Sequence, residues 1–224
     1  MPLPVGHTLA AYAICEGNRD RLRFFDKPWQ TLLFFAVLAN LPDIDFLPGF
    51  LLGNPNRFHH GFVHSLGAAV AVGLFGALYF RRRHGRFWPY FGLIAATYYS
   101  HLILDFFNQD MRAPYGVMLF WPLDSTYYMS PVALFASVHK SSDSSTFFQS
   151  LFTMHNFWVA LRELLLMGPL AAGTYFYNKW RRSRSPRKSV TLRLAKVKYL
   201  RQRAEGAPVY VEVSETRKKL KPKR

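Results

Sequence analysis

Long apolar stretches alternate with small groups of acidic and histidine side chains over the first 178 residues of this chain. An apolar segment of about 20 residues is long enough to cross the hydrocarbon core of a bilayer as an α-helix. An acid or imidazole within such a segment is costly to desolvate, so it is normally retained where it binds an ion, a proton or a substrate. The sequence therefore predicts a helical membrane protein that contains a polar site.

Four stretches are long enough, or nearly so, to be membrane spans: 29–46, 65–80, 87–107 and 157–177. The second of them is rich in glycine and alanine, which favours close packing of helices in a membrane. Two shorter apolar pieces, 5–15 and 115–123, would rise only about 1.5 Å per residue and cannot cross a core of about 30 Å. We expect an all-α integral membrane bundle of three or four spans, with short partial helices and a basic C-terminal tail.

Positive charge is concentrated at the C-terminus. Seventeen of the 29 lysine and arginine residues lie in 179–224, and the formal net charge of the chain is +16. A basic segment beside apolar spans is typical of the cytoplasmic side of a membrane protein, and no recognisable nucleic-acid module is present. The sequence predicts a membrane-embedded domain, 1–178, and a basic cytoplasmic tail, 179–224, with membrane lipids as partners and no nucleic acid.

The tail has two interpretations. It can be a solvated extension that touches anionic headgroups, at about 1 kcal/mol per basic residue near the surface. Alternatively, its alternating stretches at 190–200 and 209–213 could pair as a small hairpin, with Gly206 and Pro208 near the turn. Charge runs are usually solvated, so the extension is favoured.

The placement of charge predicts the orientation in the membrane. Basic groups at 19–27 and 81–86 follow the stretches 5–15 and 65–80, and they share one side with the tail if the spans alternate. The acids and histidines fall on the opposite side. We therefore expect the site to face the exoplasmic, here periplasmic, surface.

The types of ligand available follow from the cysteine count. Cys15 is the only cysteine, so a metal must be held by nitrogen and oxygen atoms. His101 and Asp105 are spaced i and i+4 and therefore face the same side of a helix. They could share a metal, or the carboxylate could orient the imidazole of a ligand. A buried hydrogen bond is the alternative, but the position at the end of an apolar stretch favours the metal.

Asp43 and Asp45 lie where Pro42 interrupts an apolar helix, so both carboxylates can turn inward or bridge two cations. Without an ion, the paired acids would repel each other, and burial would drive one of them to its neutral form. The alternative is a helix-capping acid beside a solvated one. We predict that one of the two orients or deprotonates a water molecule in catalysis.

Three histidines follow the acids. His64 could pair with His60 if a helix begins at His60, or with His59 if it begins at Gly61, and the spacing does not decide between them. Ser65 could offer its hydroxyl to an anion, with simple packing as the alternative.

His7 and Glu163 are candidates of a different kind. A lone histidine at the head of an apolar helix is more often structural, and only the other clusters make His7 a candidate ligand. Glu163 lies within an apolar stretch, where an acid is a functional candidate. A local ion pair or a helix–helix contact involving Arg162 is an equally favoured alternative.

Five ordered motifs resemble those of one known family: PLPVGHTLAAYAI, LPDIDFL, HHGFVHS, SHLILDFFNQD and PYGVMLFWPL. Together they are similar to the membrane-bound metal-dependent hydrolases, the YdjM-like proteins of the bacterial inner (cytoplasmic) membrane, which are distantly similar to zinc-dependent phospholipases C and single-strand nucleases. The family commonly has arginine where His60 stands. The resemblance implies that the metal-type positions are His7, Asp43, Asp45, His59, His64, His101 and Asp105.

The chemistry of these ligands and the resemblance predict a membrane-bound, multi-pass hydrolase. Zn²⁺ is the first choice for imidazole and carboxylate ligands, with Mn²⁺ as the alternative, and the number of ligands allows two ions. The expected reaction is hydrolysis of a lipid or lipid-linked phosphoester by metal-bound hydroxide, with Asp43 and Asp45 as catalytic residues. His60, Ser65 and Glu163 are candidates to contact the substrate or the metal ligands. The alternative function is a non-catalytic adaptor or transporter with a structural metal.

Overall fold

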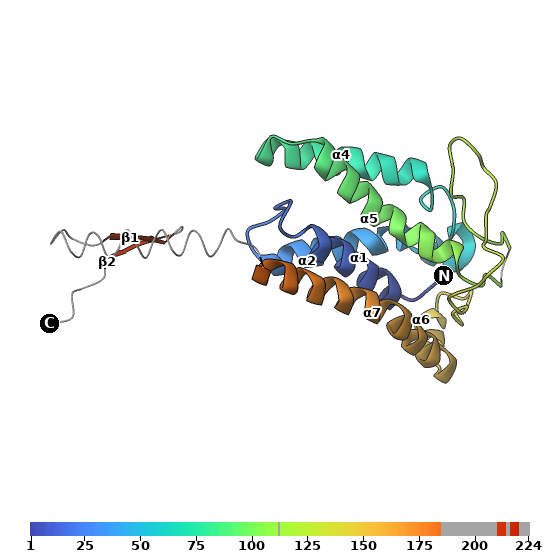
Figure 1. Ribbon diagram of the computed structural model, residues 1–224. Helices are drawn as coiled ribbons and strands as arrows, with labels where there is room; N and C mark the ends of the chain where they lie inside the picture. Colours follow the sequence, from blue (N-terminus) through green and yellow to red (C-terminus); the bar gives the residue numbers. More distant parts are fainter. Residues whose placement is uncertain (112, 185–209, 214–215, 220–224) are drawn as a thin grey trace. The chain divides into compact units, whose positions relative to one another are not determined.

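The computed structural model describes residues 1–111, 113–184, 210–213 and 216–219 (Figure 1). Contacts divide the chain into two compact units, Met1–Phe176 and Tyr177–Arg224. Each unit is described by itself. The acids and histidines of the candidate site all belong to the first.

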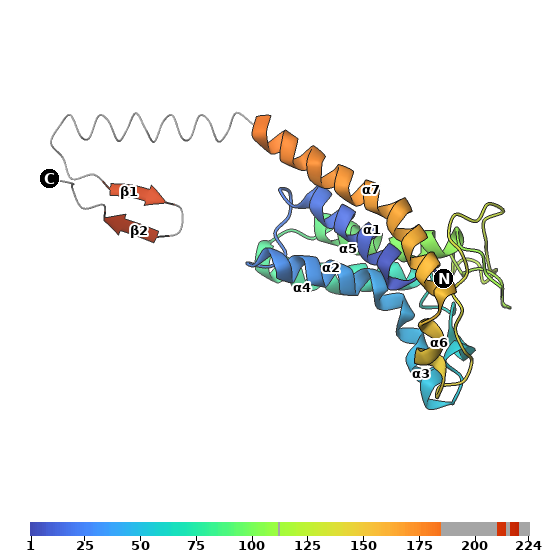
Figure 2. The same cartoon turned by 90° about the horizontal axis from the view of Figure 1, so that it is seen from below.

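Long helices build the first unit: α1 (Pro4–Asn18), α2 (Pro28–Asn40), α4 (Leu66–His84), α5 (Trp88–Phe106) and the part of α7 (Met154–Arg184) that lies within it. Helix α4 packs on α5, and α1 packs on both α2 and α5. Figures 1 and 2 show α7 running alongside α1. The first unit is therefore a helical bundle, as the sequence predicts.

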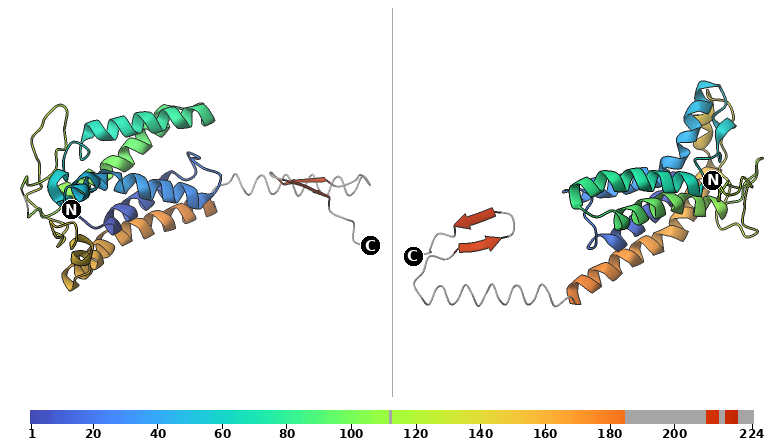
Figure 3. Two further views of the ribbon diagram at one scale, coloured as in Figure 1. Left: turned by 180° about the vertical axis from the view of Figure 1, so that it is seen from behind. Right: turned by 90° about the horizontal axis from the view of Figure 1, so that it is seen from above.

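Short elements gather at one end of the bundle (Figure 3). They are two 3₁₀ helices, η1 (Leu41–Asp45) and η2 (Pro55–Phe58), and two single-turn helices, α3 (Phe46–Leu51) and α6 (Phe147–Leu151). Proline fixes several of the junctions, since α1, α2, η1 and α5 all have a proline in their first two positions, where its missing N–H costs nothing. Helix α4 ends at Gly85, whose φ of 68° is the left-handed conformation that glycine adopts readily.

Helices α4 and α5 approach each other closely because of glycine. A Cβ atom at Gly73 would lie 2.8 Å from the Cβ of Ala95, and one at Gly76 would lie 2.7 Å from Cδ1 of Ile94. Small residues at such contacts let two backbones come together and gain van der Waals contact. The glycine-rich stretch therefore packs as the sequence predicts.

The outer faces of the helices are apolar, and buried acids and histidines lie inside together with an apolar core. Large side chains such as Val37 on α2, Phe75 on α4 and Leu165 on α7 are more than half exposed, whereas most of the acids and histidines of the candidate site are buried. Among the described helices, one segment, Pro28–Leu51, is long and apolar enough by itself to cross a membrane. This finding supports one span and does not confirm the predicted three or four. Arginines end α4, and polar side chains interrupt α5, so these helices are less apolar than their length suggests.

The prediction of a partial helix at 115–123 is wrong. Val117 forms an antiparallel bridge with Tyr128. The carbonyl groups of Leu119 and Trp121 accept hydrogen bonds from Leu66 N and Gly67 N, both at 2.8 Å. The segment is used to satisfy backbone N–H groups at the start of α4, which would otherwise lack partners. A helix would use the same carbonyls internally.

The second unit contains a two-stranded antiparallel sheet. Strand β1 (Tyr210–Val213) pairs with β2 (Thr216–Lys219), with Tyr210 opposite Lys219 and Val213 opposite Thr216. The less favoured interpretation of the tail, a small hairpin, paired a strand at 209–213 with 190–200, a stretch that lies outside the described residues. The strand found opposite β1 is a basic segment that the sequence analysis assigned to solvated tail.

Candidate metal centre

Helix α5 supplies the innermost pair of the candidate site. His101 Nε2 lies 3.1 Å from Asp105 Oδ2, and both side chains are fully buried. His101 Nδ1 donates a hydrogen bond of 2.7 Å to the carbonyl oxygen of Ala39, at the end of α2. Because that bond occupies the Nδ1 proton, the lone pair of neutral His101 is on Nε2 and faces the carboxylate.

Helix α1 brings His7 to the same place. Its ring stacks on that of His101, with centroids 3.7 Å apart, and its Nε2 lies 3.8 Å from Asp105 Oδ1. Glu163 of α7 holds the start of α1, since its carboxylate accepts hydrogen bonds from Leu3 N at 2.5 Å and Gly6 N at 2.8 Å. N–H groups in the first turn of a helix lack the usual i−4 carbonyl partner, although Gly6 N also donates to the Leu3 carbonyl at 3.2 Å. Glu163 therefore positions the turn that carries His7.

The two acids of η1 have different surroundings. Asp43 Oδ1 lies 3.6 Å from His101 Nε2 and 3.7 Å from His64 Nε2. Asp45 instead lies 3.0 Å from the Nδ1 atoms of both His59 and His64 and accepts a hydrogen bond from His60 N at 3.1 Å. Asp43 thus faces the Nε2 atoms at the centre, whereas Asp45 faces the histidine loop from the other side.

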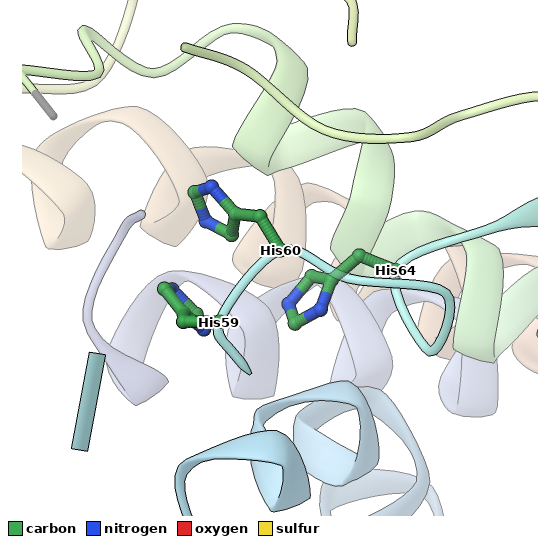
Figure 4. A group of neighbouring side chains, drawn as sticks. All are labelled: His59, His60 and His64. Atoms are coloured by element: carbon green, nitrogen blue, oxygen red, sulfur yellow. The ribbon is translucent and has the colours of Figure 1, made fainter. Parts of the chain in front are cut away.

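A loop between η2 and α4 carries three histidines, whose rings lie next to one another (Figure 4). Helix α4 begins at Leu66, so neither of the predicted helix starts, His60 or Gly61, is correct. The ring of His64 lies about equally far from those of His59 and His60, with centroids 5.1 and 5.2 Å away. His64 therefore pairs with both His59 and His60, because all three rings form one cluster.

His60 has an unusual backbone and a buried ring. Its φ of 67° lies in the left-handed region, which costs a non-glycine residue about 1–2 kcal/mol. Its Nδ1 lies 3.2 Å from Asp110 Oδ2, and its Nε2 lies 4.0 Å from Asp105 Oδ2. Burial lowers the pKa of His60, although Asp110 opposes the shift. The ring is therefore neutral near pH 7 and able to act as a ligand.

Ser65 has a structural role. Its hydroxyl accepts a hydrogen bond from Ala68 N at 3.1 Å, as the N-cap of α4, and donates one to the carbonyl oxygen of Phe62. Both functions of the hydroxyl are thus used by the backbone. This geometry supports the packing alternative over a contact with a substrate anion.

The buried polar atoms at this centre fit a divalent metal. Within the described part of the chain, several of them are buried without a hydrogen-bond partner: His7 Nδ1 and Nε2, His59 Nε2, His60 Nε2, His64 Nε2, His101 Nε2, Asp43 Oδ1 and both carboxylate oxygens of Asp105. An unpaired buried polar atom costs about 1–3 kcal/mol, so such a concentration needs a ligand. Imidazole nitrogen and carboxylate oxygen are atoms that Zn²⁺ and other divalent ions bind.

The ligand atoms form overlapping groups. Within each of four groups, the atoms lie within 4.8 Å of one another: His7, His101 and Asp105; Asp43, His64 and His101; His59, His60 and His64; Asp43, Asp45 and His59. All seven predicted metal-type residues, together with His60, belong to these groups. Segments far apart in the sequence, from α1 to α5, therefore supply one continuous centre.

A pocket of about 800 Å³ lies beside this centre. His59, His60 and Asp110 belong to its lining, so the pocket reaches the histidine loop. The long connection between α5 and α6 supplies much of the rest, including Lys140. The sequence analysis assigned no role to Asp110 or Lys140, because no local spacing links either residue to the histidines.

Residues 1–182 match the model of a family described as YdjM inner membrane protein. The chain belongs to the YdjM inner membrane protein family. The match includes every residue of the candidate centre, and membership supports a location in the membrane. No curated protein and no solved structure matches the chain. The YdjM family therefore provides the location, and the chemistry must be inferred from the centre itself.

Proposed function

We propose that this YdjM-family protein is a metal-dependent hydrolase of the inner membrane that cleaves a phosphoester in a lipid or a lipid-linked phosphate. One observation carries the proposal: unpaired imidazole nitrogens and carboxylate oxygens from α1, η1, the histidine loop and α5 converge on one buried centre. Stability alone would favour apolar side chains at such a position, because buried ionic groups without partners are costly.

The innermost residues would hold the metal. His7, His101 and Asp105 form one group of ligand atoms, and Asp43 with His64 and His101 forms a second. His101 offers one lone pair, on Nε2, and could therefore bind one ion, so it is the number of the remaining ligands that would allow a second ion; Zn²⁺ is the first choice and Mn²⁺ the alternative. When bound, a divalent ion lowers the pKa of a water molecule and offsets negative charge on phosphate oxygens.

The remaining residues of the chain would orient those ligands. The Ala39 carbonyl and the Asp45 carboxylate lie at the Nδ1 atoms of His101 and His64, which leaves both Nε2 atoms facing the centre. Such partners fix the tautomer and the direction of a metal-binding imidazole. Asp43 is the least buried acid of the inner group, at 15% side-chain exposure. It is therefore our candidate to accept a proton from the attacking water, with Asp45 as a positioning residue.

The location of the centre supports a substrate at the membrane surface. His64 precedes α4 and the arginines 81–83 end it, so the centre and this basic cluster lie about 28 Å apart along a helix of 19 residues. Basic residues favour the cytoplasmic side. We therefore propose a multi-pass protein with the centre towards the periplasm and the tail in the cytoplasm. The adjoining pocket supports an open position at the metal, whereas a structural ion is enclosed by protein ligands.

The test uses two single variants in the full chain purified in detergent. We expect Asp43→Ala and His101→Ala to lose bound metal in elemental analysis and to lose hydrolysis of any phosphoester or phospholipid that the unmodified protein cleaves. Asp26→Ala is the matched control, because Asp26 is an exposed acid, 90% accessible, that belongs to none of the four groups of ligand atoms. Full metal retention in both variants would refute the assignment. If the variants lose metal but the unmodified protein hydrolyses none of the substrates, a structural ion in an adaptor or transporter is favoured.

A further inference from the structure

The pocket beside the metal centre has a basic wall, formed by Arg57, His139, Lys140 and His155. Among the residues that line the pocket, Asp110 is the acidic one. Its carboxylate is engaged, since Oδ2 lies 3.2 Å from His60 Nδ1 and accepts a hydrogen bond from Gly116 N at 3.2 Å. The basic wall therefore makes the pocket favourable to an anion.

The basic wall is held in place by Asn156 of α7. Asn156 is buried, and its side chain accepts a hydrogen bond from His139 N at 2.8 Å and donates one to the His139 carbonyl at 2.7 Å. The rings of His139 and His155 stack with centroids 3.7 Å apart. A segment fixed in this way keeps the neighbouring Lys140 in position before any ligand binds, which reduces the entropic cost of binding.

Lys140 is linked to the metal centre through an aromatic ring. Its ammonium lies 4.7 Å from the centroid of the Phe46 ring, and that ring stacks on His59 with centroids 4.1 Å apart. Burial lowers the pKa of Lys140 to about 8, although nearby carboxylates including Asp43 oppose the shift. The side chain therefore remains mostly protonated at neutral pH. Arg57, on the η2 helix that precedes the histidine loop, is exposed and reaches the same pocket.

We propose that the basic wall is a binding site for a phosphate group, in which Lys140 and Arg57 contact phosphate oxygens beside the histidine–aspartate centre. Lysine offers a compact charge and arginine a planar fork of donors, and both are common partners of phosphate. The inference deepens the proposed function and rests on it for the statement that the bound phosphoester is cleaved. It goes further in naming the residues that recognise the phosphate.

Binding of inorganic phosphate to the full chain in detergent, measured by calorimetry, tests the proposal. We expect Lys140→Met and Arg57→Gln each to weaken the affinity about tenfold, since each removes a charge-assisted hydrogen bond. Lys140→Arg should retain most of the affinity. Lys27→Met is the matched control, because Lys27 is exposed and precedes α2 away from the pocket lining. Unchanged affinity in both Lys140→Met and Arg57→Gln would overturn the proposal.

A second arm identifies the source of the phosphate group. Phosphatidic acid and phosphatidylcholine, each in mixed micelles, and free phosphate are compared for their ability to displace phosphate that is already bound to the protein. Displacement by phosphatidic acid at lower concentration than free phosphate identifies a lipid headgroup, and the reverse order identifies a soluble phosphate. Either order supports the site when Lys140→Met also lowers the affinity of the protein for the competitor. Displacement that is equal in unmodified protein and Lys140→Met counts against it.

The outcomes separate this inference from the proposed function. If Lys140→Met and Arg57→Gln bind phosphate normally while Asp43→Ala loses metal and hydrolysis, the function stands and the basic wall has another role. If both pocket variants lose phosphate affinity with unchanged metal content, and no phosphoester is cleaved by the unmodified protein, the binding site stands without the enzyme.

Discussion

Asp43 and Asp45 are two residues apart, yet they have different partners. Asp43 faces the Nε2 atoms of His64 and His101, whereas Asp45 lies at the Nδ1 atoms of His59 and His64. The sequence identified both acids as metal-type residues but assigned them the same role. That difference depends on which ring nitrogen each carboxylate contacts. Such contacts join distant segments, and the spacing of residues along the sequence does not predict them.

The different roles can be separated by mutation. We expect Asp45→Asn to lower metal affinity about 10- to 100-fold, the range typical when a partner of a metal-binding histidine is changed. Asp43→Asn should lower it further, because it removes a ligand charge directly. Competition with a metal-binding dye measures both affinities, and Asp26→Asn serves as the control at an exposed acid. Equal losses at Asp43 and Asp45 would mean that Asp45 is itself a ligand.

At the scale of the helices, α4 and α5 depend on the small residues between them. A Cβ at Gly73 would lie 2.8 Å from the Ala95 Cβ, which has no flexible end to move aside, whereas a Cβ at Gly92 has no neighbour within 4 Å. We expect Gly73→Ala to destabilise the protein by about 1–3 kcal/mol through overpacking. Gly92→Ala should be neutral or stabilising by up to about 1 kcal/mol, because alanine is the better helix former.

Thermal unfolding in detergent, followed by circular dichroism, compares the two alanine variants at the same helix pair. A lower midpoint for Gly73→Ala and an unchanged or higher one for Gly92→Ala is the expected result. Equal midpoints would show that the close approach of α4 and α5 contributes little to stability.

Helices were more predictable from the sequence than the segments between them. The apolar stretch 87–107 became α5, Trp88–Phe106, because apolar composition and a proline near its start act locally. The stretch 115–123 was equally apolar, but its carbonyls accept hydrogen bonds from the start of α4. The histidine loop likewise begins no helix before Leu66. At 115–123, backbone contacts with a distant segment override local preference, and in the histidine loop His60 N donates to the Asp45 carboxylate instead of to a helical carbonyl.

For the molecule as a whole, the remaining question is how it lies in the membrane. The outer faces of α2, α4 and α7 expose large apolar side chains, whereas acids and histidines are buried inside the unit together with its apolar core, an arrangement that suits lipid outside and ligands inside. The centre lies at the start of α4, and arginines lie at its end. If the basic end is cytoplasmic, the opposite end must be periplasmic for any arrangement in which α4 crosses the bilayer.

Single cysteines at the two ends of α4 test this orientation. Cys15 is the only native cysteine, so Cys15→Ser gives a background free of thiols. Leu123 is 84% exposed and follows the carbonyls that meet the start of α4, whereas Arg82 is exposed at the far end. We expect Leu123→Cys to react with a membrane-impermeant maleimide in intact cells whose outer membrane is permeabilised. Arg82→Cys should react only after the inner membrane is broken, because the bilayer separates it from the reagent. The reverse pattern would place the metal centre on the cytoplasmic side, and reaction of both cysteines in intact cells would show that α4 does not span the membrane.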